Sequence, residues 1–461
     1  MGIPWKKLSR KAWDLLVQVI RATAPDKTQC DPPPDKTVTD ALDKWRGGGT
    51  GLLLLLSLAA PVDAQTPTQA QVDSLRREVA RLDSALGAVK AQLARLDSLL
   101  AVAPDTTPTP PDTTPPPVPT LPAWAQAVDR LLGPIPNCAT LATGPAREWY
   151  DKWQLWEPKR WAADSARWDA ANYYDRASIY YAMAVCELPH DPALSARYLD
   201  RAHQTAVDYR DKYLIKNDGG ASPHWAQLEG VALHAVITGD AASRRIIGRT
   251  AEVLAASNYY RNRTFGDTLH VDMENRIAQR ALLAALLAHE LQSAGKSFPA
   301  SRWPGVLDTL LAQTLRAQRA DGSWRYRCAG GCKLTFPYMD ALLTDVLIRY
   351  QRLYRADARL LPVIKATVDY HLANAIRADS SWHYNLTPST FGSKSASPDL
   401  NGLQPSTYAW LAAQTGDPSY LARVQPLFVK GVRATYYAGV KQFNQAFYSS
   451  YRYVAAVSRV P

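Results

Sequence analysis

Between Val72 and Leu100, apolar residues recur at alternating spacings of three and four positions. This is the heptad pattern of a coiled coil, in which one apolar stripe faces a partner helix and the remaining faces carry charge. Such a helix has no core of its own, so we expect residues 72–100 to associate with copies of the same segment. The alternative is a single helix folded back on the rest of the chain. We assign residues 65–102 to the coiled coil.

From about residue 123 onward, apolar positions follow the 3.6-residue period of α-helices, and the period-2 alternation of strands is nearly absent. Short links with Gly followed by Asp, such as Gly239-Asp240 and Gly416-Asp417, separate consecutive segments. Gly ends one helix in a left-handed conformation, and Asp caps the start of the next. We expect helices at roughly 124–132, 164–187, 191–213, 224–238, 241–257, 268–294, 303–319, 337–354, 357–376, 402–415, 418–437 and 443–457.

These helix–turn–helix units repeat at intervals of about 50–60 residues, which is typical of stacked antiparallel helical pairs. A closed ring accommodates the pairs better than a short open solenoid does. We therefore predict an all-α fold for residues 123–461, an α/α toroid of five to six helical hairpins. The coiled-coil helix and a linker precede it.

Proline and aromatic residues occupy different parts of the chain. Nine of the 19 residues from Pro104 to Pro122 are proline, whereas all 23 Tyr and all 7 Phe lie at or beyond Tyr150. The Pro/Thr-rich stretch, which we place at 103–122, is typical of an extended polyproline-like spacer. The overall contents of 47% hydrophobic and 21% charged residues are ordinary for globular proteins and exclude fibrous or wholly disordered classes.

The segment before the heptads has the features of an export signal. Its apolar core, about residues 51–60, follows Lys44 and Arg46 and precedes small residues that end at Ala64. A basic flank, a short apolar run and small residues before the cleavage point are typical of a secretory signal peptide. The apolar run is shorter than the roughly 20 residues that cross a bilayer. We therefore predict that residues 1–64 form a leader.

The 44 residues that precede this signal do not fit a secretory leader. Either translation begins near Val38 or Leu42, or the extension belongs to a membrane-anchored form. In both cases we expect a secreted or cell-surface protein, located in the periplasm or outside the cell.

Cysteine usage agrees with export. Cys30 lies in the leader, and the four remaining cysteines are Cys138, Cys186, Cys328 and Cys332. An even number in a secreted chain suggests disulfides. Cys138 could join the start of the toroid to the helix that ends near Cys186, and the other two could close a tight Gly-containing loop. A zinc site is the alternative, but no His lies at ligand spacing, so we expect no metal and no cofactor.

The chain carries a net charge of +11, but the positive residues form no run or stripe. We therefore expect a mildly basic surface and no nucleic-acid partner. An acidic glycan remains a possible partner for such a surface.

At residues 145–458, the helical pairs, the Thr-Gly-Asp turns and the aromatic content resemble the six-hairpin toroid superfamily of glycoside hydrolases and polysaccharide lyases. The turn Gln318-Arg-Ala-Asp-Gly-Ser-Trp324 also resembles a turn found in several α/α-barrel families, including terpene cyclases, whose Asp-rich motifs are missing here. We expect Asp-Gly to reverse the chain and Trp324 to pack across the helical pair. The C-terminal part, from Ala396 to Gln445, resembles an uncharacterised family of secreted bacterial proteins.

The resemblance implies a bowl lined by the ends of the inner helices, with the substrate bound inside it. Hydrolysis of a glycosidic bond needs two carboxyl groups, whereas elimination from a uronic-acid polymer needs a Tyr or His base and a group that neutralises the carboxylate. The candidate catalytic acids are Asp175, Glu229 and Asp340. The candidate substrate-binding residues, which are aromatic or charged side chains near helix starts or in a long loop, are Tyr174, His224, Trp225, Glu274, Arg276, Tyr338, Trp382, His383 and Tyr384.

Each of these residues also has a structural interpretation. Neighbouring acids and arginines often form ion pairs, and aromatic residues at helical spacing usually belong to the core. Residues 382–384 lie outside the expected helices, so we expect them to be exposed and able to stack on sugar rings. The chain lacks the motifs of zinc proteases, serine esterases and nucleotide-binding loops.

The sequence therefore favours a carbohydrate-active protein that cleaves a polysaccharide, by hydrolysis or elimination, in an aromatic-lined bowl. The alternative is a non-catalytic surface or filament protein, in which the toroid is a glycan-binding head on an oligomeric stalk. Two carboxyl groups facing each other across the bowl would favour hydrolysis. A bowl filled by side chains would favour the structural alternative.

Overall fold

The computed structural model describes residues 121–169, 174–222, 226–256, 275–324, 326–327, 333–386 and 396–459. By its internal contacts the chain divides into two units, Met1–Pro116 and Pro117–Pro461, and the described residues all belong to the second. The predicted leader, the predicted coiled coil and all but the last two residues of the predicted linker therefore lie outside the described residues.

The described part of the chain is built from an inner and an outer set of α-helices. The inner helices are α8 (Arg176–Glu187), α10 (Glu229–Thr238), α13 (Asn275–Glu290), α15 (Pro337–Leu353), α17 (Pro405–Thr415), α19 (Val440–Phe447) and α20 (Ser450–Val457). The outer helices are α6 (Gly144–Asp164), α9 (Pro192–Tyr209), α11 (Ala241–Ala255), α14 (Trp303–Arg316), α16 (Leu360–Asn374) and α18 (Ser419–Ala434). None of the described helices is both long and apolar enough to cross a membrane.

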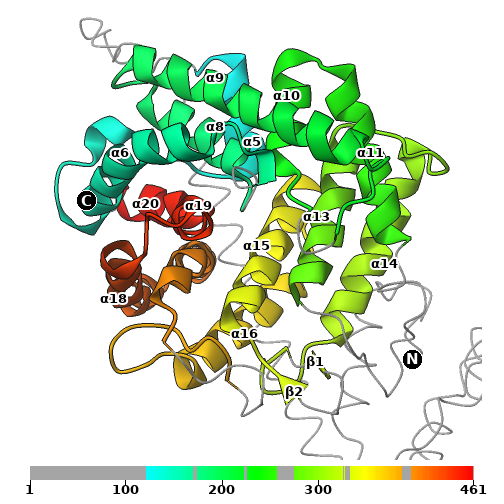
Figure 1. Cartoon of the computed structure of the whole chain (residues 1–461). Coiled ribbons are helices and arrows are strands. Elements are labelled where there is room, and N and C mark those ends of the chain that lie inside the picture. Colours follow the sequence, from blue (N-terminus) through cyan, green and yellow to red (C-terminus); the bar gives the residue numbers. More distant parts are fainter. Residues whose placement is uncertain are drawn as a thin grey trace, which may run out of the picture. The chain divides into compact units, whose positions relative to one another are not determined.

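Each inner helix from α8 to α17 packs against the outer helix that follows it in the sequence, and also against neighbouring inner helices. Figure 1 shows these pairs arranged around a ring, with the earliest outer helix, α6, beside the last helices of the chain, α19 and α20. The predicted all-α toroid of helical hairpins is therefore confirmed.

Burial distinguishes the two sets as the hydrophobic pattern predicts. In α13, all side chains from Asn275 to Ala288 are buried except that of Arg276, because the helix is covered on every side. In α9, the buried residues recur every three or four positions, as Ser195, Tyr198 and Ala202 do. An outer helix needs only one apolar stripe because its other face meets solvent.

The predicted Gly–Asp links are present and have the expected geometry. Gly239 and Gly416 end α10 and α17 with φ angles of 72° and 70°. The Asp240 side chain then accepts a hydrogen bond from the backbone N–H of Ser243 at 2.6 Å, at the start of α11. These turns reverse the chain between inner and outer helices.

The ring closes where α6 meets the end of the chain, and Trp153 lies at the centre of this contact. Its buried indole ring packs against Tyr180 of α8, Tyr198 of α9, and both Phe443 and Phe447 of α19. Residues nearly 300 positions apart in the sequence thus share one aromatic cluster. This contact joins the first hairpin to the last one.

A short helix, α5 (Ala123–Leu132), contacts the inner helices α8 and α10, and we call it the plug helix. Its buried residues include Val128 and Leu131. Arg352, at the C-terminal end of α15, donates a hydrogen bond to the Leu131 carbonyl at 3.0 Å, and Arg452 of α20 donates one to the Leu132 carbonyl at 2.9 Å. The plug helix therefore binds at the far end of the ring, away from the first turns of α8, α10 and α15.

A disulfide links the segment that follows the plug helix to the C-terminal end of α8. Cys138 begins the short 3₁₀ helix η3 (Cys138–Thr140), and its sulfur is bonded to that of Cys186. This pairing confirms one of the two predicted disulfides. Cys328 and Cys332 lie outside the described residues.

The sequence pattern was wrong about several helix boundaries. It did not predict α6, whose interior contains Pro158 and whose buried face includes the acids Glu157 and Asp164. The segments 164–187 and 443–457, each expected as one helix, are interrupted: α8 begins only at Arg176, and α19 and α20 are separate helices. The described chain also contains a π-helix, η4 (Arg210–Ile215), two further 3₁₀ helices, η5 (Ala300–Arg302) and η6 (Pro398–Leu403), and a two-stranded antiparallel sheet of β1 (Tyr326–Arg327) and β2 (Lys333–Leu334).

The turn at residues 318–324 has the predicted role and recurs once more. Trp324 is buried, and its indole N–H donates a hydrogen bond to Thr367 of α16 at 2.7 Å. The chain Arg-Ala-Asp-Ser-Ser-Trp at 377–382 repeats this sequence, with an isolated β-bridge between Ile376 and Trp382 that corresponds to the one at 318 and 324. Both turns place a Trp ring in the core between consecutive hairpins.

Candidate functional site

The three candidate acids all lie in the first turns of inner helices. Asp175 is the N-cap residue of α8, Glu229 is the first residue of α10, and Asp340 lies in the first turn of α15. A helix N-terminus presents unpaired backbone N–H groups and a positive dipole end, so carboxylates are favoured there. The sequence indicates these positions because each acid comes at the start of a long apolar segment.

Asp175 is held between two inner helices. Its backbone adopts a left-handed conformation with φ 46°, which is uncommon for a residue other than Gly. One carboxyl oxygen, Oδ1, accepts a hydrogen bond from the backbone N–H of Ser178 at 3.0 Å, as expected of an N-cap residue. The other, Oδ2, accepts one from the backbone N–H of Gly230 on α10, also at 3.0 Å. This second bond brings the first turns of α8 and α10 together.

Glu229 completes a pair with Asp175, and we call these two residues the acid pair. The two carboxyl groups are close enough to act on each other directly, and both side chains are almost fully buried, with 2% and 1% of their surfaces exposed. The Tyr448 hydroxyl donates a hydrogen bond to Oε1 of Glu229, and a terminal nitrogen of Arg349 lies 3.4 Å from the same oxygen. Residues from four inner helices therefore meet at one carboxylate.

The surroundings give the two acids opposite pKa shifts. Burial, together with the charge and hydrogen bond of Glu229, raises the pKa of Asp175. Burial also acts to raise the pKa of Glu229, but the positive charges of Arg349 and Arg280 outweigh it and lower that pKa. Two carboxyl groups in contact share one proton because both cannot be ionised at once. The opposite shifts of the two pKa values favour the proton on Asp175 and the ionised form of Glu229.

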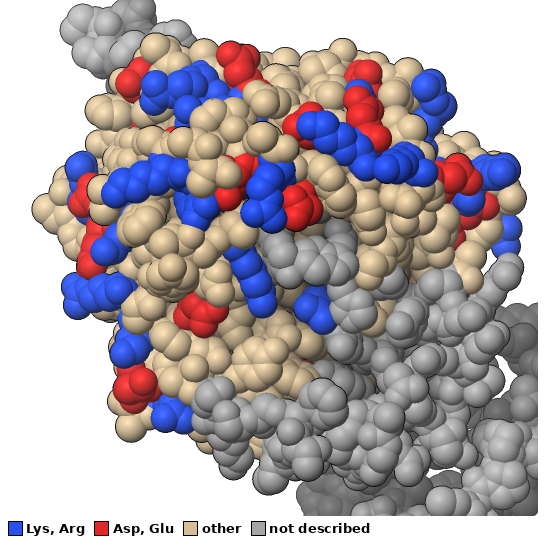
Figure 2. All heavy atoms as spheres, viewed as in Figure 1, with Lys and Arg blue, Asp and Glu red and all other residues tan. Residues whose placement is uncertain are grey.

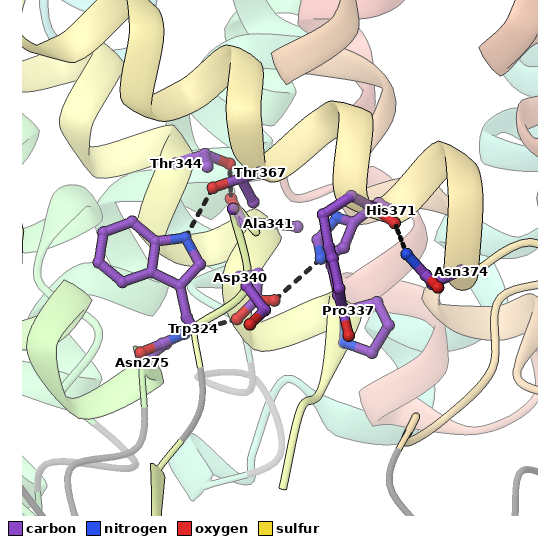
Figure 3. Close-up of polar contacts among 12 residues, drawn as sticks. Asn275, Trp324, Pro337, Asp340, Ala341, Thr344, Thr367, His371 and Asn374 are labelled. Atoms are coloured by element: carbon purple, nitrogen blue, oxygen red, sulfur yellow. Dashed lines mark hydrogen bonds and ion pairs between the residues drawn. The ribbon is translucent and has the colours of Figure 1, made fainter. Parts of the chain in front are cut away.

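Asp340 does not join the acid pair. Figure 3 shows its carboxyl group between Asn275 of α13 and His371 of α16, and it bonds to both. The distance from Asp340 Oδ2 to Nε2 of His371 is 2.9 Å. Burial raises the pKa of Asp340 although both partners act to lower it. The three candidate acids therefore form two separate sites, and Asp340 joins α13, α15 and α16 in the core.

Two groups of aromatic rings lie near the acid pair, and Tyr174 of one acts electrostatically on Tyr338 of the other. Tyr384, with 36% of its surface exposed, stacks on Tyr338 at 5.4 Å between ring centroids, and both contact Phe336 edge-on. Tyr174 directly precedes Asp175 and packs edge-on against Tyr448, which binds Glu229. The candidate residues Tyr174, Tyr338 and Tyr384 thus lie in the surroundings of the acid pair.

The expected exposure of residues 382–384 holds only in part. Trp382 is buried with 1% exposure and packs edge-on against His371, so its ring is not available to a ligand. His383 is half-buried and forms an isolated β-bridge with Ala396. The repeated turn explains this difference, because the Trp at its end fills the core. His224, Trp225 and Glu274 lie outside the described residues.

Positively charged side chains accompany the aromatic rings. Arg276 and Arg280 lie one turn apart on α13. Burial raises the pKa of the Tyr174 hydroxyl to about 12, although the positive charges of both arginines act to lower it. Burial lowers the pKa of Lys441 at the start of α19, and the nearby positive charge of Arg276 lowers it further. On the face drawn in Figure 2, Lys and Arg side chains lie among Asp and Glu, and some are beside the hollow at its centre.

Three side chains that bind or surround the acid pair, Arg280, Arg349 and Tyr448, were not among the sequence candidates. The arginines carry a usable signal in the sequence, since each lies among mainly apolar residues of a helix that is largely buried. A buried guanidinium is unfavourable without an anionic partner, so its presence indicates a nearby carboxylate. No such signal marks Tyr448 among the many core tyrosines.

The acid pair can hold and transfer a proton, but its geometry is not that of a glycosidase with two opposed carboxyl groups. Such enzymes place the groups about 5–5.5 Å or about 6.5–9.5 Å apart, whereas Asp175 and Glu229 are in direct contact. In the described part of the chain, no group of three or more His, Cys, Asp and Glu side chains is arranged to hold a metal ion.

Comparison with known proteins gives similarity only at the level of three-dimensional structure. No family model and no curated protein matches the sequence. One similar solved structure is the unsaturated glucuronyl hydrolase from Bacillus sp. GL1, described as responsible for the degradation of glycosaminoglycan; it is 12% identical, with a TM-score of 0.41, over 63% of this chain and 87% of that one. A second, described as a substituted form of UGL with dGlcA-Glc-Rha-Glc, has the same values. At this identity the similarity concerns the helical fold alone.

Proposed function

We propose that this protein cleaves an acidic polysaccharide and that Asp175 supplies the proton for the leaving group. The acid pair carries this proposal, because it keeps one carboxylic acid protonated beside an ionised one at the first turns of α8 and α10. A protonated carboxyl with a raised pKa is the group that general acid catalysis requires near neutral pH.

Hydrolysis agrees with the site better than elimination does. Elimination from a uronic acid needs a base, and burial raises the pKa of Tyr174 to about 12 and that of Tyr338 above the range of an ordinary phenol. In hydrolysis, the Asp175 proton passes to the glycosidic oxygen, water adds to the anomeric carbon, and a water proton returns to the acid pair. Because Glu229 stays ionised, the returning proton binds to Asp175.

The charges near the acid pair favour an acidic substrate. Arg276 and Arg280 lie beside Tyr174, and Lys441 lies close to Arg276. Guanidinium groups bind carboxylate and sulfate groups well because their fork of N–H donors matches the anionic oxygens. Exposed Tyr384, stacked on Tyr338, offers an aromatic face for a sugar ring at the surface.

The alternative is a non-catalytic glycan-binding head, and one observation favours it: both acids are buried and hydrogen-bonded to protein groups. The two functions differ in turnover. The full chain should be incubated with a panel of acidic and neutral polysaccharides, with binding measured on a glycan array. Cleavage is then measured by release of reducing ends and by the ultraviolet absorbance of new C=C bonds.

We expect reducing ends without new absorbance, and we expect Asp175→Asn to abolish their release. Glu187→Gln is the matched control, because Glu187 is a buried carboxylate at the opposite end of the same helix, bound by Tyr150. It should retain activity. Binding without turnover would support the glycan-binding head, and absence of both would refute a carbohydrate function.

We also propose that the protein is exported and that residues 72–100 make it oligomeric. The signal-like segment ending at Ala64 and the uninterrupted heptads support these two points. N-terminal sequencing of the secreted protein tests the first, with Gln65 as the expected first residue. Light scattering of the full chain tests the second, and Leu→Asp substitutions at Leu82 and Leu93 should yield monomers.

A further inference from the structure

The interior of the ring contains a connected series of charged side chains between the acid pair and the plug helix. Arg349 of α15 lies 3.4 Å from Oε1 of Glu229, and its Nε lies 3.0 Å from Asp345. The other oxygen of Asp345 lies 2.9 Å from Arg452, which also donates a hydrogen bond to the carbonyl of Leu132 at the end of the plug helix. The series therefore extends from α10 through α15 and α20 to α5.

The spacing along α15 explains why Arg349 can bind two acids. Asp345 and Arg349 are four residues apart, so their side chains lie on the same face of the helix. Asp345 holds the Nε side of the guanidinium, which leaves a terminal nitrogen directed at Glu229. All three side chains are buried, with 6% or less of each exposed. Low-dielectric surroundings make such charge interactions stronger than those at a surface.

We propose that Arg349 is a positioning residue for the acid pair: by binding Glu229 and being held by Asp345, it keeps Glu229 ionised and so fixes the shared proton on Asp175. The positioning role of Arg349 rests on the proposed function only where it concerns catalysis. The plug helix supports the arrangement, because it binds Arg452, the second partner of Asp345.

Other charged and titratable groups face the acid pair as well. Arg280 of α13 acts on Glu229, and Tyr448 binds it through the hydroxyl group. Tyr181 of α8 is close to Asp175, and Tyr451 of α20 lies near Arg349. The phenols are neutral near pH 7, so Arg280 is the second cation acting on the pair. Of the two, Arg349 is the one that forms an ion pair with Glu229, and it therefore has the larger effect.

The test measures the protonation of the two acids directly. The full chain is labelled with ¹³C in the side-chain carboxyl groups of Asp and Glu, and each resonance is followed by NMR as a function of pH. The signals absent from Asp175→Asn and Glu229→Gln identify the pair. In Arg349→Met we expect the midpoint of Glu229 to rise by about 1–3 pH units, the effect of one close opposite charge. The Asp175 signal should show partial loss of its proton to Glu229.

Two further variants make the result specific. Arg349→Lys retains the charge but cannot bind both acids through a planar fork, so the Glu229 midpoint should lie between those of the wild type and Arg349→Met. Arg352→Met removes a cation three residues further along α15 that binds the Leu131 carbonyl instead of the pair, and it should leave both midpoints unchanged. If Arg349→Met does not fold, a raised midpoint in Arg349→Lys supports the proposal and an unchanged one overturns it.

The titration needs no substrate, so the two proposals fail independently. A wild-type chain that cleaves no polysaccharide refutes the proposed function and leaves the role of Arg349 intact. Unchanged midpoints in a folded Arg349→Met variant refute the positioning role, whatever the activity. If both proposals hold, the pH–rate profile of Arg349→Lys shifts together with the Glu229 midpoint.

Discussion

Replacing Gly230 by Ala should separate the two helices that carry the acid pair. A Cβ atom at this position would lie 2.3 Å from the Cβ of Ala177 and 2.7 Å from the Oδ1 atom of Asp175. The contact with Ala177 involves a rigid side chain, so α10 must move away from α8. This movement breaks the hydrogen bond from the Gly230 N–H to Asp175, which is 3.0 Å long.

The expected loss of stability combines opposing effects. Overpacking of a core costs about 1–3 kcal/mol, and loss of a hydrogen bond to a neutral group, such as the protonated Asp175 carboxyl, costs about 0.5–1.5 kcal/mol. Ala is favoured over Gly in a helix by about 0.5–1 kcal/mol. The free energy of unfolding should therefore fall by about 1–3 kcal/mol, measured by urea unfolding with near-ultraviolet circular dichroism as the signal.

Gly305 supplies the matched control, because it also lies in a helix but has no atom within 4 Å of the added Cβ. Gly305→Ala should raise stability by about 0.5–1 kcal/mol. Adding Ala177→Gly to the Gly230→Ala variant should recover part of the loss, since it removes the rigid contact. If Gly230→Ala and Gly305→Ala have the same effect, the close approach of α8 and α10 does not exist and the geometry of the acid pair is wrong.

Three further predictions concern stability away from the acid pair. Reduction of the Cys138–Cys186 disulfide, which spans 48 residues, should lower the free energy of unfolding by about 2–4 kcal/mol in urea titrations with and without reductant. Burial lowers the pKa values of His203 and His234 below the ordinary 6.5. The stability that their neutral forms contribute is therefore complete above pH 6.5 and is lost as the pH falls below it. The double variant with Gln at both positions should weaken this dependence of the urea midpoint on pH. Gly322→Ala should lower the free energy of unfolding by about 2–4 kcal/mol. The residue has a φ of 83°, and a Cβ there would lie 2.2 Å from the Ala366 carbonyl oxygen. A loss below about 1 kcal/mol would contradict this close contact.

The helical pairs could be predicted from the sequence because their signals are local. An apolar stripe defines an outer helix such as α9, and a Gly–Asp link such as Gly239-Asp240 ends one helix and caps the next within a few residues. The helix α6 could not be predicted in this way. Its buried face includes the acids Glu157 and Asp164, so no apolar stripe marks the helix in the sequence. Only closure of the ring against α8 and α19 explains why Trp153 lies in the core.

The sequence also indicated that the candidate acids lie at the starts of inner helices, but it did not show which of them meet. Asp175, Glu229 and Asp340 each begin an inner helix, and nothing in their local sequence distinguishes them. The tertiary structure places Asp175 against Glu229 and gives Asp340 the partners Asn275 and His371. The ring geometry therefore decides which acids act on each other.

Local sequence by itself determined the helical class, the pairing of consecutive helices and the position of acids at helix starts, because propensity, capping and periodicity act over a few residues. Only the tertiary structure decided the partners of each acid and hence their opposite pKa shifts. The raised pKa of Asp175 comes from burial and from Glu229, and the lowered pKa of Glu229 depends on Arg349, 120 positions away, and on a tyrosine 219 positions away. Electrostatic interactions depend on distance in space and on burial, which the fold creates.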